Sequence, residues 1–73
     1  MRTVFRKTLV RADHFRSFEV HSVPYLKGWE TSERADQTLV DQQRHSDWHR
    51  VEQVLSRFQQ QIVELRAAGW EEA

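Results

Sequence analysis

The apolar positions along the chain follow two different patterns that meet near residue 44. From residue 3 to residue 44, short runs rich in β-branched and aromatic residues alternate with turn residues, which is typical of antiparallel strands. Beyond residue 47, apolar residues recur every three or four positions, as on one side of an amphipathic helix. The pattern predicts an α+β fold in a single domain, residues 1–73. An antiparallel meander of three or four short strands is followed by one long C-terminal α-helix packed on one face of the sheet.

The strand signals are uneven in strength. Residues 3–10 and 15–23 read as the first two strands, and Pro24 suits the end of the second because proline cannot donate to a strand ladder. Residues 29–34 predict a third strand. The segment 38–44, "TLVDQQR", is polar enough to form either a fourth strand or a loop.

The helix signal includes both of its ends. Six apolar residues share one stripe: Trp48, Val51, Leu55, Phe58, Ile62 and Leu65. We expect a helix over about 47–68, with Ser46 as the N-cap and Asp47 in the first turn, near the positive end of the helix dipole. Gly69 suits the left-handed position after the last turn, and Trp70 then folds back onto the end of the stripe.

The predicted strands carry apolar side chains on both faces. Phe5 and Leu9 point to one side of the first strand, whereas Val4 and Val10 point to the other. A chain of 73 residues also has a thin core. Since the helix covers only one face, we expect a second copy of the sheet to cover part of the other face, and the sequence predicts a homodimer.

The composition of the chain bears on what can stabilise the fold and on where the protein is located. The chain has no cysteine, so neither disulfides nor thiolate zinc sites stabilise it. No apolar run approaches the roughly 18 residues of a membrane span, and the first ten residues lack the apolar segment of a signal peptide. We expect a cytoplasmic protein that has no contact with membranes and needs no cofactor.

The main functional hypothesis is a small non-enzymatic protein-interaction or regulatory module. Its partner is a second copy of the chain or another protein, and exposed aromatic side chains are the natural anchors of such contacts. The candidates are Tyr25 and Trp29 around the second turn and Trp70 at the end of the helix. For the two tryptophans the core is the favoured position, and an interface is the alternative.

Charge is distributed unevenly and suggests nucleic-acid binding as an alternative. The net charge is zero, but residues 1–27 carry an excess of four positive charges and residues 28–73 an excess of four negative charges. The two halves therefore attract each other, within one fold or between copies, and a basic half can also meet phosphates. The basic residues of the predicted strands are Arg2, Arg6, Lys7, Arg11 and Arg16.

A second alternative is metal binding at the start of the helix. His45 and His49 are four residues apart, and Glu52 follows one turn later. The spacing resembles a helical zinc motif, but the glutamate that this motif places between its histidines is missing. If Ser46 is the N-cap, His45 also lies outside the helix. Metal-dependent activity at His45 and His49 is the only enzymatic alternative, and we expect no enzyme.

Overall fold

The computed structural model describes residues 2–73 and confirms the predicted α+β fold, including a strand at 38–44. Its elements in chain order are β1 (Arg2–Arg11), β2 (His14–Val23), the 3₁₀ turn η1 (Pro24–Leu26), β3 (Gly28–Ala35), β4 (Thr38–His45), α1 (Trp48–Ala67) and β5 (Glu71–Glu72). The two-residue β5 was not predicted.

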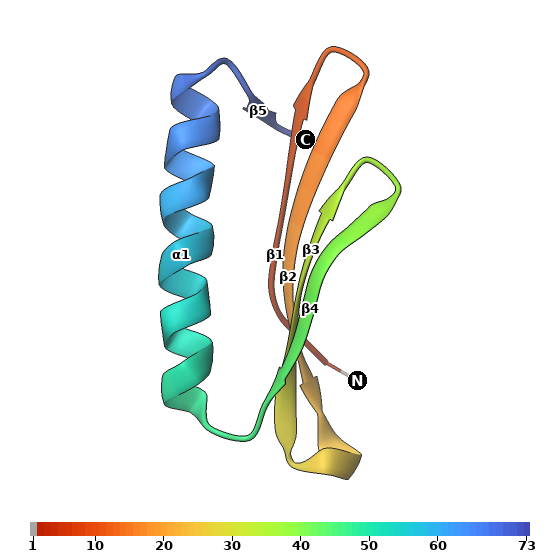
Figure 1. The fold of residues 1–73 in the computed structure, drawn as a ribbon, viewed down its shortest axis with the longest axis vertical. Coiled ribbons are helices and arrows are strands. Elements are labelled where there is room, and N and C mark those ends of the chain that lie inside the picture. The colour runs from red at the N-terminus through yellow and green to blue at the C-terminus, as the bar shows by residue number, and fades with distance from the viewer. Residues whose placement is uncertain (1) are drawn as a thin grey trace.

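The sheet is an antiparallel meander with the strand order β4-β3-β2-β1-β5. Successive hairpins place β1 to β4 side by side, and the chain then returns along the sheet as α1 (Figure 1). After the helix, β5 pairs with Leu9 and Val10 of β1 and so covers part of that edge. The two edges of the sheet therefore differ: β5 adds to β1, whereas β4 is the last strand on its side.

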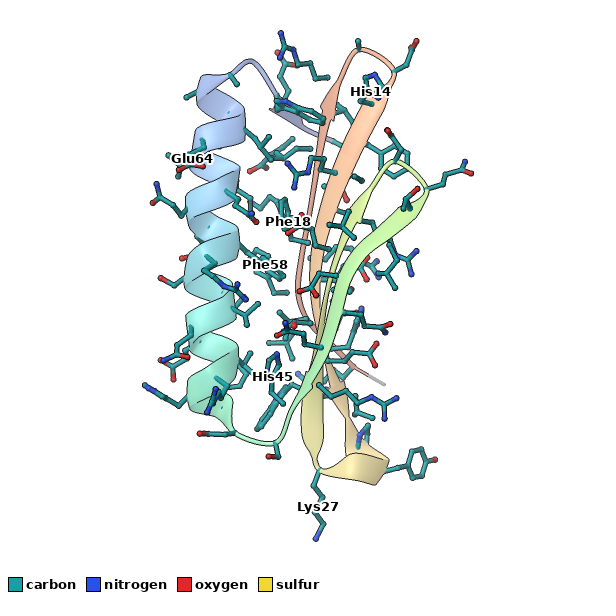
Figure 2. All side chains as sticks on the ribbon, viewed as in Figure 1. His14, Phe18, Lys27, His45, Phe58 and Glu64 are labelled. Atoms are coloured by element: carbon teal, nitrogen blue, oxygen red, sulfur yellow. The ribbon has the colours of Figure 1, made fainter. Side chains whose placement is uncertain are left out.

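The core lies between α1 and one face of the sheet. Its buried side chains are Leu9, Phe18, Val20, Val51, Val54, Phe58 and Ile62. At its centre the rings of Phe18 and Phe58 meet with their centroids 5.1 Å apart (Figure 2). Most of the predicted apolar stripe thus packs on the sheet, although Trp48 at its start is 38% exposed and Val54, beside the stripe, is buried in the core.

The opposite face of the sheet differs from the prediction, because its centre is charged and not apolar. Glu19 forms an ion pair with Arg6, whose Nε atom lies 3.2 Å from Oε1, and is hydrogen-bonded to His21 at 2.8 Å. Burial raises the pKa of Glu19, but the His21 hydrogen bond and the charge of Arg6 outweigh it and hold the pKa below its ordinary value. Val4 and Val10 are exposed. This face therefore offers no continuous apolar surface for a second sheet.

The helix begins one residue later than predicted. Asp47, and not Ser46, is the N-cap: its backbone is extended and its Oδ1 atom accepts a hydrogen bond from the His49 amide at 3.0 Å. The reason is that β4 continues to His45, which leaves Ser46 in the connection. Both residue types are good caps, so the local sequence alone did not separate them.

The end of the helix is as predicted. Gly69 has φ +100°, and its amide donates to the Arg66 carbonyl at 3.1 Å. The Trp70 amide donates to the Leu65 carbonyl at 3.0 Å, which completes a Schellman motif, and Trp70 packs against the core. Within the described residues, no helix is long and apolar enough to cross a membrane.

One aspartate ties the tips of the two long hairpins together. Asp36, at φ +55° in the β3–β4 turn, accepts a hydrogen bond from the Phe15 amide at 3.0 Å and is hydrogen-bonded to His14 at 3.2 Å. The Phe15 amide, followed by His14, holds the pKa of Asp36 below its ordinary value. These bonds fix β3 and β4 relative to β2.

Candidate functional site

The exposed edge of the sheet is the backbone of β4. This strand pairs with β3 on one side, and no other strand within residues 2–73 pairs with its second side. The β3–β4 pairing contains a bulge: Arg34 pairs with Leu39 and Glu33 with Asp41, so Val40 is the extra residue. Residues 41–45 pair regularly with β3. An edge strand presents a row of backbone donors and acceptors that can pair with another chain.

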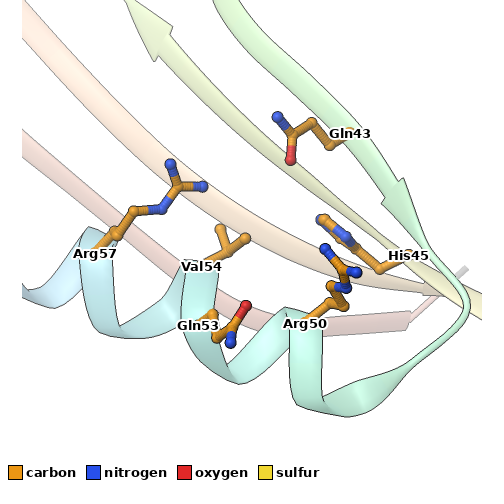
Figure 3. A pocket seen from close by; sticks show the side chains of 6 residues that line it. All are labelled: Gln43, His45, Arg50, Gln53, Val54 and Arg57. Carbon is orange, nitrogen blue, oxygen red and sulfur yellow. The ribbon is translucent and has the colours of Figure 1, made fainter.

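A groove of about 410 Å³ runs between this edge strand and the helix (Figure 3). It is lined by Gln43, His45, Arg50, Gln53, Val54 and Arg57. The groove exists because the fully buried apolar side chains of the sheet come from β1 and β2, whereas Thr38–Arg44 of β4 stay exposed beside the helix. Only Val54 of the lining is apolar and buried, so the groove has an apolar base and polar walls.

The groove walls are basic. Arg50 and Arg57 lie on the helix seven residues apart, which is about 10.5 Å along its axis. Neither arginine forms an ion pair with any residue in the described part of the chain, and no carboxylate lines the groove. His45 is hydrogen-bonded through Nε2 to the Thr31 hydroxyl at 3.1 Å, which fixes its ring against β3. The site can bind an anionic group.

A carboxylate without a partner lies on the same face of β4. Asp41 precedes Gln43 and His45 by two and four positions, so alternation directs all three to the helix side. Its cross-strand neighbour is Glu33, which is buried and already bonded to Arg16 at 2.6 Å. Asp41 is exposed and forms no ion pair with another residue of 2–73. Within its own copy, the cross-strand neighbour of Asp41 is therefore a carboxylate that is already paired, and Asp41 has no cationic partner there.

The structure separates the predicted metal ligands. His45 ends β4 and lines the groove, whereas His49 is exposed in the first turn of α1, and Glu52 is exposed one turn further on. Among residues 2–73, no group of three or more histidine, aspartate or glutamate side chains is arranged to hold a metal ion. The metal hypothesis remains a prediction for which the structure supplies no third ligand.

The five basic residues of the N-terminal half do not form one surface. Arg6 is bonded to Glu19 on the outer face, whereas Lys7 bonds Glu72 at 2.8 Å and Arg16 bonds Glu33 on the helix side. The remaining two, Arg2 and Arg11, are exposed near opposite ends of β1. The expected attraction between the two halves of the chain is thus made within one fold. Nucleic-acid binding by these residues remains a prediction.

The three predicted aromatic anchors have different environments. Tyr25, in η1, is 96% exposed. Trp29 is partly buried and packs edge-on against Trp48, with 5.2 Å between the ring centroids. Trp70 is also partly buried against the core. Only Tyr25 remains fully available to a partner, and the two tryptophans mainly close the two ends of the core.

The groove was not predicted from the sequence, although part of its signal was present. Arg50 and Arg57 lie on one side of the apolar stripe of the helix, next to Val54. On β4, the alternate residues Asp41 and Gln43, which share the face directed toward the helix, are both polar. Polar residues there indicate a strand that the helix does not cover.

In comparisons with known proteins, no protein-family model, curated protein or solved structure matches the chain.

Proposed function

We propose that the chain is a small non-enzymatic protein-interaction module that acts as a homodimer, and that two copies join through β4. The observation that carries this proposal is an eight-residue edge strand whose outer side has no partner within residues 2–73. Two copies of β4 can pair antiparallel about a twofold axis and continue the sheet from one copy into the other. The interface then uses the edge of the sheet and leaves its charged outer face in solvent.

Side chains on β4 support this mode of association. Leu39 and Val40 are 41% and 54% exposed in the single chain, and both lie within the proposed interface. Burying them contributes hydrophobic free energy in addition to the backbone hydrogen bonds. The groove beside β4 supplies guanidinium, imidazole and amide groups, which suit recognition rather than nucleophilic chemistry. We place this module in the cytoplasm.

The test is the solution mass of the protein, measured by light scattering across protein concentrations. We expect a dimer for the native chain and a monomer for the double variant Leu39→Lys/Val40→Lys, because lysines on an edge strand oppose pairing. Val63→Lys is the matched control, since Val63 is 62% exposed on the helix, away from β4. It should leave the dimer intact.

Hydrogen exchange provides an independent measurement on the same samples. In the dimer, the β4 amides that point away from β3 are hydrogen-bonded to the second copy and exchange slowly. In the lysine variant they should exchange as fast as amides in exposed loops, while the β2 amides stay protected. A native chain that remains monomeric at the highest concentrations, or a lysine variant that still dimerises, contradicts the proposal.

A further inference from the structure

We infer that Asp41 of each copy enters the groove of the other copy and binds Arg50 and Arg57 there. This inference rests on the proposed β4 dimer and names the contact that specifies it. Within residues 2–73, the structure contains a β4 carboxylate without an ion pair and, on the helix wall of the groove, two arginines in the same condition. A twofold axis next to β4 brings each of these groups opposite the other.

The alternation of side chains along β4 limits how two copies can pair. Asp41, Gln43 and His45 face the helix, and residues directly opposite each other in a sheet point to the same face. A dimer with both helices on one face therefore sets odd-numbered residues opposite odd-numbered ones. A twofold axis at Gln42 places Asp41 opposite Gln43 of the other copy, and an axis at Gln43 places it opposite His45.

Both of these arrangements deliver the carboxylate to the groove. Gln43 and His45 are the two β4 residues that line it, and Arg50 and Arg57 stand on the opposite wall (Figure 3). The two arginines span about 10.5 Å along the helix, whereas Gln43 and His45 are about 6.8 Å apart along the strand. A carboxylate above either strand position therefore faces the wall that carries the two arginines, whose long side chains can reach toward it.

A third arrangement is disfavoured by charge. If the twofold axis passes at Asp41, the two Asp41 carboxylates oppose each other, next to the Glu33 of each copy. Like charges directly across a strand pair are destabilising. The other two registers keep the two Asp41 carboxylates apart and place each of them beside the basic groove, whereas Glu33 stays opposite Asp41 within each copy in every register. Charge thus selects the register of the dimer, and the contact occurs twice because the interface is symmetric.

The inference is tested by reversing the charges on each side of the contact. Asp41→Lys puts a lysine into a basic groove, and Arg50→Glu/Arg57→Glu puts Asp41 into an acidic one. We expect each variant to raise the dimer dissociation constant by roughly tenfold or more, because both symmetric contacts lose a partly exposed ion-pair cluster and gain a repulsive pair in its place. Glu52→Lys makes the same change in net charge as Asp41→Lys on an exposed part of the helix and should leave the constant within about twofold.

Mixing the two variants gives the decisive measurement. In the heterodimer, the lysine introduced by Asp41→Lys meets the two glutamates introduced by Arg50→Glu/Arg57→Glu in one groove, while the native contact forms in the other groove. The heterodimer should therefore exceed both homodimers in native mass spectrometry. For the same reason, the triple variant Asp41→Lys/Arg50→Glu/Arg57→Glu should dimerise again by itself. Circular dichroism and the triple variant together separate a lost contact from a misfolded chain.

The outcomes distinguish the inference from the proposed function. If the native chain dimerises and the Leu39→Lys/Val40→Lys variant does not, but charge reversal has no effect and no heterodimer preference appears, the Asp41 contact is wrong while the β4 dimer stands. If the native chain does not dimerise, both are wrong. Recovery of the dimer in the mixture and in the triple variant is the expected result.

Discussion

Truncating Phe58 to alanine tests the account of the core most directly. Phe58 is 5% exposed, and its ring packs at 5.1 Å from that of Phe18, which is fully buried. Replacing a buried phenylalanine by alanine costs about 3–5 kcal/mol, including the cavity that remains. Proteins are stable by about 0.05–0.15 kcal/mol per residue, which for 73 residues is about 4–11 kcal/mol. The variant should therefore lose about a quarter or more of the total free energy of unfolding.

The assay is urea unfolding followed by circular dichroism, at one fixed protein concentration because a dimer adds a concentration-dependent term. Val63→Ala is the control: this side chain is 62% exposed on the same helix and should change stability by less than about 0.5 kcal/mol. A double-mutant cycle with Phe18→Leu and Phe58→Leu should give a coupling of about 0.5–1.5 kcal/mol from the ring pair. A loss below about 1 kcal/mol for Phe58→Ala would refute the assignment of the core centre.

Three further predictions concern the ends of elements and the charged contacts. Asp47→Ala should cost about 1 kcal/mol in urea unfolding because it removes the N-cap bond to the His49 amide, and Asp47→Ser should recover most of it. Gly28→Ala should clearly lower the melting temperature, because the new Cβ atom would lie 2.5 Å from the His45 carbonyl oxygen, a backbone atom that cannot rotate away. An unchanged melting temperature would contradict this close contact between Gly28 and His45. Acid should destabilise the fold, because the pKa values of Glu19, Asp36 and Glu72 are held below the ordinary 4.5, 3.8 and 4.5. Their contribution is complete above these ordinary values and is lost as pH falls through the lowered ones, so pH-dependent unfolding of Asp36→Asn should show a weaker acid loss than the native chain.

The elements that the sequence predicted correctly are those with a local cause. The helix stripe follows from its 3.6-residue period, and its end follows from Gly69 at φ +100°. The weakest strand signal, at 38–44, has a physical explanation in the structure. Residues Thr38–Arg44 are exposed in β4 because it is an edge strand that the apolar core does not cover, so no buried face imposes an alternating pattern on it.

Other features depend on contacts between distant segments and could not be predicted locally. A glutamate such as Glu33 is expected at the surface, yet it is buried because Arg16, two strand positions from Phe18, reaches it across the sheet at 2.6 Å. The pairing of β5 with β1 requires the length of α1 to return the chain to that edge. The groove depends in the same way on where the helix axis crosses the sheet, which no local pattern encodes.

The width of one helix explains why an uncovered strand belongs to this architecture. A helix with its side chains is about 10–12 Å wide, whereas neighbouring strands lie about 4.8 Å apart, so one helix shields two or three strands. The fully buried apolar side chains of the sheet come from β1 and β2, Trp29 of β3 packs beside them, and the helix-facing side of β4 carries polar ones. A β4 dimer would turn that side of the strand into the floor of a groove between two helices. Asp41 and the two groove arginines are then the residues that select the partner strand, while the apolar core remains the same in each copy.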